Sequence, residues 1–365
     1  MLVTLLNKDN ANGLKKALET LSTQESVELC SDFDVLVMDG WSTDSSEDVV
    51  REFASRFECV KFIRQRFPGG VGQARIEAVR HALDASYDII IWGDSENIYG
   101  KTYISEILKC INSARECSIC SGSTYVRDGL WGKLFYWYHA YHHLFKLVSK
   151  RHAPGNNKAV RSEVYKTHIY PATSRSDDFF FSLSIRNDVT ICHCKEASLT
   201  TALPTSFRGV LVWQRGRVRG LVEGSLLLGR RLPPDFPPWF LFMISPFILT
   251  TLYLTRSLGP VHALSILPEA LITAFTVGVA YMVLKLELLA RERFSGYRPM
   301  QGLLGFIGMY LHAVFTTYYS LKYFLKLRGH VDEIRGRDAE VKKYFGFSNN
   351  PTETRLQDPP PCFKI

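Results

Sequence analysis

The sequence predicts an α/β domain built on a mostly parallel sheet, followed by C-terminal transmembrane helices. Apolar runs alternate with helical patterns through the first half of the 365 residues, which is typical of a parallel sheet covered by helices. From about residue 239 to about 325, Leu, Phe, Ile, Val and Tyr dominate. We therefore expect a cytosolic domain at 1–235, about three transmembrane helices within 236–328, and a cytosolic or disordered tail at 329–365.

Five apolar runs in the first half read as strands, and four amphipathic patterns between them read as helices. A continuous apolar run such as Phe33–Met38 indicates a strand buried on both faces. Because ligands bind at the carboxyl ends of parallel strands, Asp39 and Asp94, which each follow a strand, should meet in one crevice. The strands are Leu2–Leu6, Phe33–Met38, Val60–Ile63, Tyr87–Trp92 and Ser118–Tyr125, and the helices are Leu14–Leu21, Ser45–Phe57, Val71–Ala85 and Tyr103–Ala114.

Three C-terminal segments, Trp239–Leu258, Val261–Leu284 and Gly302–Leu321, are long enough to cross a hydrocarbon core of about 30 Å. The alternative is a set of buried helices. Glu269 lies inside the second segment, where an acid is by default functional or paired, although a break in the helix would also explain it. Three spans would put the basic tail outside, so one segment can instead be re-entrant or interfacial. The aromatic stretch Leu130–Lys150 suits either a membrane interface or packing on the sheet.

The net charge of +8 comes partly from basic residues on both sides of the apolar region. Anionic lipid headgroups attract such residues by about 1 kcal/mol each, so we expect membrane lipids as partners. No nucleic-acid-binding motif is present, and we expect no nucleic-acid partner. The charge and the apolar segments together predict a multi-pass protein of the cell membrane, with the first domain on the cytosolic face.

Eight cysteines occur, and two pairs, Cys117-x-x-Cys120 and Cys192-His-Cys194, have spacings that a zinc site could use. Both pairs lie in β-rich apolar stretches, where alternation points neighbouring side chains to opposite faces and buried free thiols are common. A disulfide framework is not expected in a large domain on the cytosolic side.

Acidic side chains follow two of the strands and one later loop. In Asp94-Ser-Glu96, residues two apart on an extended turn can both face the crevice and bind a hard divalent ion. Asp39 can accept a hydrogen bond from a base N–H, and Asp44 can cap the following helix. Asp178, in Ser176-Asp-Asp178, is placed to act as a base, although adjacent acids there can also mark a helix start.

Two basic motifs complement these acids. Gly69-Gly-Val-Gly72 feeds a helix whose N-terminus can bind phosphate, and Arg75 adds charge. In Gln214-Arg-Gly-Arg217, Gln214 and Arg217 are three residues apart and share a helix face, where arginine can bridge phosphate oxygens. A basic membrane-surface helix is the alternative for the second motif.

The order of these motifs resembles the inverting family 2 glycosyltransferases of the GT-A fold. Thr4-Leu-Leu-Asn7 looks like the first strand and its Pro-x-Tyr-Asn turn, with Leu6 in place of tyrosine. Asp39-Gly-Trp-Ser-Thr-Asp44 looks like the nucleotide motif Asp-Asp-Gly-Ser-x-Asp, with Gly40 and Trp41 replacing its second Asp and its Gly. Gly70–Arg75 looks like the family's glycine-rich Ala-Arg segment.

The later motifs extend the resemblance over roughly residues 1–230. Asp94-Ser-Glu96 matches Asp-x-Asp, and Gly155–Ser162 resembles the loop that faces the acceptor. Ser176-Asp-Asp178 matches Thr-Glu-Asp, whose final Asp is the family's base. Gln214-Arg-Gly-Arg-Val218 is similar to the Gln-x-x-Arg-Trp of the cellulose and hyaluronan synthase branch, with Val218 in place of the tryptophan. That replacement weakens the case for a processive polymerase.

The resemblance implies an enzyme, a metal-dependent glycosyltransferase that moves a sugar from a nucleotide-diphospho-sugar to a glycan or lipid-linked acceptor. Asp178 is the predicted base, and Asp94 and Glu96 are the predicted ligands of Mg²⁺ or Mn²⁺. The alternatives are a polyprenyl-phosphate glycosyltransferase and a non-catalytic membrane scaffold. The residues predicted to bind the nucleotide sugar are Asn7, Asp39, Arg75, Asp94, Gln214 and Arg217.

Overall fold

A computed structural model describes residues 1–113, 117–126, 134, 154–185, 189–256, 262–293 and 300–347. The predicted aromatic helix Leu130–Lys150 lies outside the described residues except for Leu134, which is buried against Val210. The end of the predicted tail, from residue 348, also lies outside them.

One mixed sheet forms the centre of the N-terminal domain, with the strand order β3-β2-β1-β4-β7-β6-β8-β5. The first four strands in this order are parallel, β7 runs antiparallel to both of its neighbours, and β6 and β8 are parallel to each other. All five predicted strands are confirmed. The strands are β1 Leu2–Asn7, β2 Asp34–Asp39, β3 Val60–Arg64, β4 Ile89–Asp94, β5 Ile98–Tyr99, β6 Cys117–Val126, β7 Lys158–Arg161 and β8 Thr190–Thr201.

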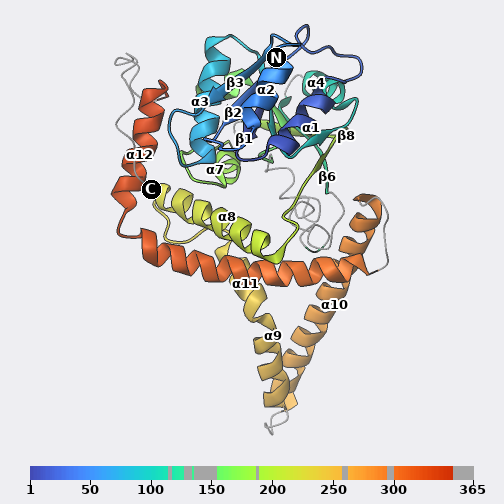
Figure 1. Ribbon diagram of the computed structural model, residues 1–365. Helices are drawn as coiled ribbons and strands as arrows, with labels where there is room; N and C mark the ends of the chain where they lie inside the picture. The colour runs from blue at the N-terminus through green and yellow to red at the C-terminus, as the bar shows by residue number, and fades with distance from the viewer. Residues whose placement is uncertain are drawn as a thin grey trace.

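Helices cover both faces of this sheet, as Figure 1 shows. Strand residues of one parity, such as Val3 and Val35, are buried with α1, α2 and α4, whereas those of the other parity, such as Leu36, are buried with α3 and α7. This alternation follows from the two-residue repeat of a strand. All four predicted helices are confirmed. The helices of this domain are α1 Ala11–Leu21, α2 Ser46–Ala54, α3 Val71–Asp84, α4 Tyr103–Ser113, the 3₁₀ turn η1 Ser162–Lys166, and α7 Asp177–Ser184.

The C-terminal part is helical, with α8 Phe207–Leu227 and α11 Gln301–Leu327 side by side beneath the domain (Figure 1). Helices α9 Phe236–Arg256 and α10 His262–Arg293 extend away from the domain as a pair. Among the described residues, one stretch, Glu269–Leu288 of α10, is long and apolar enough to cross a membrane. The prediction of about three spanning helices is therefore not confirmed.

Helix α11 differs from the other apolar helices because one of its faces is polar and buried. His312, Thr316 and Ser320 are four residues apart and at most 1% exposed, whereas Tyr318, Leu321 and Leu325 on other faces are exposed. A four-residue spacing keeps the polar row on one side of the helix. The apolar pattern that predicted a third span thus belongs to a helix that packs along α8.

Within the predicted tail, Val331–Tyr344 forms an ordered helix, α12, that packs on the N-terminal domain. The Asp338 carboxylate accepts a hydrogen bond from the Ala172 N–H at 2.7 Å. The rings of Tyr344 and Phe345 pack edge-on against Phe67, with centroids 5.1 and 5.8 Å away. The chain therefore returns to the first domain after the apolar helices (Figure 1).

Six cysteines are paired in disulfide bonds, which contradicts the expectation of no disulfide framework. The pairs are Cys30–Cys59, Cys110–Cys120 and Cys117–Cys192. The candidate zinc cysteines do lie on strands, β6 and β8, whose register sets Cys120 opposite Cys192. Cys192 is bonded to Cys117 of β6, and Cys120 to Cys110 of α4. The sequence could not reveal this register. In the described part of the chain, no group of His, Cys, Asp and Glu side chains is arranged to hold a metal ion by itself.

Candidate active site

The segment 171–178, which leads into α7 and carries Asp178, is held against the start of α3. The N–H groups of Val71 and Gly72 donate to the carbonyl oxygens of Ser174 and Thr173, each at 3.1 Å. A side chain at position 72 would lie 2.1 Å from the Pro171 carbonyl oxygen, so only glycine allows this approach. The predicted use of this glycine-rich turn, phosphate binding, is wrong for these two N–H groups because the protein's own carbonyls already occupy them.

Helix α8 holds the same segment from the other side. The Glu223 carboxylate accepts from the Ser174 N–H at 2.9 Å, and the Ser176 hydroxyl donates to the Arg217 carbonyl at 3.0 Å. A Cβ atom on Gly220 would lie 2.1 Å from the Arg175 carbonyl oxygen. The 171–178 segment is thus clamped between α3 and α8, and Asp177 and Asp178 begin α7 from a fixed position.

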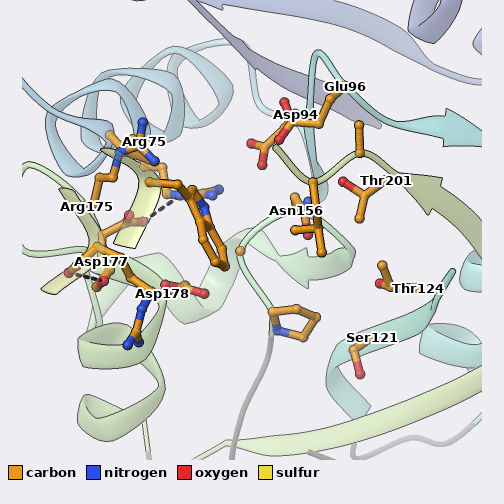
Figure 2. Close-up of a pocket in the computed structure, with 18 of the residues that line it drawn as sticks. Arg75, Asp94, Glu96, Ser121, Thr124, Asn156, Arg175, Asp177, Asp178 and Thr201 are labelled. Carbon is orange, nitrogen blue, oxygen red and sulfur yellow. Dashed lines mark hydrogen bonds and ion pairs between the residues drawn. The ribbon is translucent and has the colours of Figure 1, made fainter. Parts of the chain in front are cut away.

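Five of the predicted site residues line one pocket, a cavity of about 230 Å³. Figure 2 shows Asp94 and Glu96 next to each other at the end of β4, with Asp178 across the cavity from them. The expectation that Asp39 and Asp94 meet in one crevice is not confirmed, because Asp94 lines this pocket together with Glu96 and Asp39 does not. The five residues are Arg75, Asp94, Glu96, Asp178 and Arg217.

Arg75 and Asp177 form a buried ion pair in the pocket wall, with 2.6 Å between Arg75 Nε and the Asp177 carboxylate (Figure 2). Burial lowers the pKa of the Arg75 guanidinium, but Asp177, Tyr170, Asp94 and Asp178 together more than offset this, so the pKa is raised and the side chain stays charged. The ring of Trp92 lies 4.7 Å from the same guanidinium. Because Asp177 is paired in this way, Asp178 is the acid that is left to act on a ligand.

The carboxylates of Asp94 and Glu96 fit a hard divalent ion. Burial raises the pKa of Asp94 to about 6, against the opposing effect of the Arg75 charge, so a cation placed beside it would favour the ionised form. Mg²⁺ is usually held by one or two carboxylates together with the phosphates of a substrate. Two oxygen-bearing side chains lining a pocket meet that requirement, and Asp94 and Glu96 are the residues that would hold the ion.

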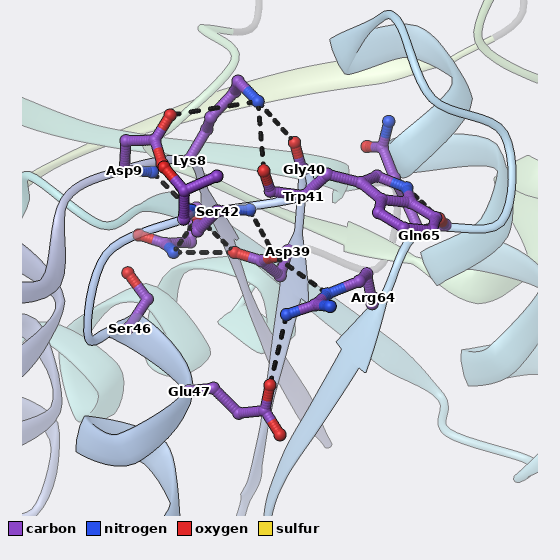
Figure 3. Close-up of polar contacts among 12 residues, drawn as sticks. Lys8, Asp9, Asp39, Gly40, Trp41, Ser42, Ser46, Glu47, Arg64 and Gln65 are labelled. Atoms are coloured by element: carbon purple, nitrogen blue, oxygen red, sulfur yellow. Dashed lines mark hydrogen bonds and ion pairs between the residues drawn. The ribbon is translucent and has the colours of Figure 1, made fainter.

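Asn7 and Asp39, predicted to contact the nucleotide, are joined to each other instead of lining the pocket. The Asp39 carboxylate accepts hydrogen bonds from the Asn7 amide at 3.0 Å and from the Ser42 N–H at 2.8 Å. Figure 3 shows Asp39 and Ser42 side by side in this loop. Arg64 lies 3.7 Å from the same carboxylate. Asp39 therefore ties the loop after β2 to the end of β1, and its contact with a base remains a prediction.

Asp44 caps a helix, as predicted. Its carboxylate accepts from the Ser46 N–H at 3.1 Å, at the start of α2, and also from the Ala11 N–H of α1 at 2.8 Å. Trp41, which stands where the resemblance has glycine, adopts a φ of 64° and donates its indole N–H to the Gln65 carbonyl. These contacts fix the loop between β2 and α2 (Figure 3).

Gln214 and Arg217 share one face of α8, as their spacing predicted. The side-chain oxygen of Gln214, Oε1, accepts a hydrogen bond from Arg217 Nε at 3.3 Å. Arg217 reaches the pocket, whereas Gln214 is fully buried behind it. Two residues of α11, His312 and Thr316, contact this pair. The sequence analysis missed them because they lie inside an apolar stretch. The four-residue spacing of a histidine and a threonine in that stretch was the pattern that could have indicated a buried polar face.

Lys158 is a second buried group that sequence reasoning did not single out. It is fully buried on β7, with its ammonium 5.2 Å from the Tyr170 ring. Burial, and then the charge of Arg75, lower the pKa of Lys158 to about 7. The position of this lysine next to the apolar residues of a strand was the pattern that could have indicated its burial. Its proximity to Arg75 makes it part of the electrostatic environment of the pocket.

Residues 2–169 match the model of glycosyl transferase family 2. The match covers just under half of the chain and supports a family 2 domain of the GT-A fold; it includes Asp94 and Glu96 but ends before Asp178 and α8. No protein among those with curated descriptions matches the sequence.

Solved structures support the fold. A mannosyltransferase from Pyrobaculum calidifontis in complex with GDP-Man and Mn²⁺ aligns with a TM-score of 0.54 at 17% identity, over 87% of this chain and 86% of that one. TarS residues 1–349 of S. aureus align at 14% identity with a TM-score of 0.44, over 60% of this chain and 65% of that one. At such identities the first likeness shows a shared fold.

The clamp on the 171–178 segment predicts the effect of one added methyl group. In Gly220→Ala, the new Cβ would overlap the Arg175 carbonyl, so the segment must move, at a cost of about 1–3 kcal/mol. We expect a lower melting temperature and faster amide hydrogen exchange in residues 171–178. Gly336→Ala, on α12 with open space around it, is the matched control. Exchange in this segment that is equal in both variants would contradict the clamp.

Proposed function

We propose that this protein is a membrane-anchored inverting glycosyltransferase that moves a sugar from a nucleotide-diphospho-sugar to an acceptor hydroxyl on a glycan or a lipid-linked glycan. The observation that carries the proposal is that Asp94 and Glu96 line the same pocket as Asp178 and lie across the cavity from it. The family 2 match of residues 2–169 supports the reaction class. The mannosyltransferase of the same fold, in complex with GDP-Man and Mn²⁺, supports the type of donor and cofactor.

The pocket provides each group that the reaction needs. Asp178 accepts the proton of the acceptor hydroxyl while that oxygen attacks the anomeric carbon, on the face opposite the departing diphosphate, which inverts the configuration. Arg217 lines the pocket and can bind the diphosphate oxygens through a guanidinium that is always charged. Mg²⁺ or Mn²⁺, held by Asp94 and Glu96, would supply neutralisation of the diphosphate charge.

Removal of the proposed base separates catalysis from donor binding. We expect Asp178→Asn to reduce sugar transfer by at least about 100-fold, since general base catalysis contributes that much or more, with nucleoside diphosphate binding in Mn²⁺ nearly unchanged. Transfer to native membranes from a panel of radiolabelled nucleotide sugars and calorimetry with UDP or GDP measure the two effects. Asp48→Asn, an exposed acid on α2, is the control.

Each other outcome of that experiment points to a specific alternative. A fully active Asp178→Asn enzyme would contradict the base and favour transfer to a polyprenyl phosphate, because that acceptor is already ionised. No metal-dependent binding of any nucleoside diphosphate by the unmodified protein would contradict the proposal and favour a membrane scaffold.

We also propose that α9 and α10 anchor the chain in the cell membrane, with the N-terminal domain at the cytosolic face. Support comes from the large apolar side chains that these helices expose, among them Leu241, Phe247, Val277 and Leu284. The packing of α12 on the domain favours an even number of crossings between them, because α12 lies on the same side as the domain. A helix pair that crosses twice, with α11 at the interface, meets this condition.

The paired cysteines test the proposed side of the membrane. The structure brings these cysteines together as disulfide bonds, but the cytosol reduces such bonds, so a domain on the cytosolic face would carry Cys30, Cys59 and the other four paired cysteines as thiols in the cell. Rapid alkylation under denaturing conditions followed by mass spectrometry measures this. Cys194, which is free in the structure, should be alkylated in every case and serves as the internal control. Disulfide bonds at the six positions in the cell would contradict a cytosolic domain and favour an oxidising compartment.

A further inference from the structure

A cluster of buried polar side chains joins α8 to α11 directly behind the pocket. Gln214, His312 and Thr316 are at most 1% exposed, and Arg217 is 8% exposed. Burying polar groups is unfavourable unless each finds a hydrogen-bond partner, so a cluster of this kind constrains the positions of its members.

The contacts converge on the Arg217 guanidinium. Its Nη2 atom lies 3.0 Å from His312 Nε2 and 3.1 Å from the Thr316 hydroxyl oxygen. The other ring nitrogen of His312, Nδ1, lies 2.9 Å from the Gln214 amide. One imidazole therefore contacts both residues of the Gln214–Arg217 pair at once.

The first turn of α9 completes the surroundings of the imidazole. The Trp239 ring packs edge-on against His312, with 4.8 Å between centroids. The Asp235 carboxylate, immediately before α9, interacts electrostatically with Arg217. Helix α11 thus supplies two side chains that contact the Arg217 guanidinium directly, and Trp239 of α9 packs on one of them, His312.

We propose that His312 is a positioning residue for the transfer reaction: its ring holds the Arg217 guanidinium in the pocket wall, in the orientation that binds the diphosphate. This inference rests on the proposed function, since it assigns a purpose to the position of Arg217. It makes α11, a helix whose outer face is apolar, part of the active site. The ring accepts from Arg217 through Nε2, because a guanidinium has only donors, so Nδ1 carries the ring proton and faces the Gln214 side-chain amide.

Two substitutions separate the acceptor from the packing. His312→Phe keeps a ring against Trp239 but removes both nitrogens, whereas His312→Gln loses the ring but keeps a carbonyl oxygen that can accept from Arg217. We expect His312→Phe to weaken binding of UDP or GDP in Mn²⁺ by at least about tenfold, since hydrogen bonds to charged groups are worth that much. His312→Gln should recover most of the loss. His330→Gln, an exposed histidine outside the cluster, is the control.

A double-mutant cycle distinguishes positioning from general stability. If His312 acts through Arg217, His312→Phe will not weaken nucleotide binding further in an Arg217→Ala background. An equal weakening in both backgrounds, or nucleotide binding by His312→Phe equal to that of the unmodified protein, would overturn the proposal.

The same variants also test the contact without any ligand. Thermal unfolding of the two single variants and the double variant should show a coupling between His312 and Arg217, and strictly additive shifts in melting temperature would overturn the contact. If the unmodified protein binds no nucleoside diphosphate, the proposed function fails and the role of His312 in the reaction fails with it. If it binds one and the His312 variants behave as the control does, only the His312 inference fails.

Discussion

The backbone around Arg175 and Ser176 lies against α8 so closely that Gly220 leaves no room for a methyl group, and much of the site depends on this approach. A Cβ atom at position 220 would overlap the Arg175 carbonyl oxygen, and the Ser176 hydroxyl donates a hydrogen bond to the Arg217 backbone carbonyl. On the opposite side, α3 binds Thr173 and Ser174 through its first N–H groups. The base-bearing segment is therefore fixed relative to β4, which carries Asp94, and to α8, which carries Arg217.

The two buried guanidinium groups of the site both have hydrogen-bonding or ionic partners. Arg75 is paired with Asp177 in the pocket wall, and Arg217 is held by His312 and Thr316. An unpaired charge at either position would be costly, since burial penalises the charged form of each group. Pairing Asp177 leaves its neighbour Asp178 facing the cavity. The two adjacent acids thus differ in their surroundings: Asp177 serves as the partner of Arg75, and Asp178 faces the cavity.

Local pattern was sufficient to predict the strands and helices of the first domain and the place of Asp94 and Glu96 at the end of a strand, whereas the role of Asp178 was implied by the family resemblance. Buried strands and amphipathic helices have strong periodicity, and their carboxyl ends meet by topology. Partners distant in the sequence could not be predicted: the glycine-rich turn binds Thr173 and Ser174, and Cys120 faces Cys192, because of register and packing that no short motif encodes. The count of about three spanning helices stays a prediction, because composition does not distinguish a spanning helix from one such as α11, whose polar row contacts α8.

A structure of the protein with a nucleoside diphosphate and Mn²⁺, with the metal located by its anomalous scattering, tests the central claim most directly. We expect one metal between the Asp94 and Glu96 carboxylates, with the diphosphate extending toward Arg217 and the Asp178 carboxylate on the other side of the cavity. A nucleotide bound elsewhere, or a metal that neither Asp94 nor Glu96 contacts, would contradict it.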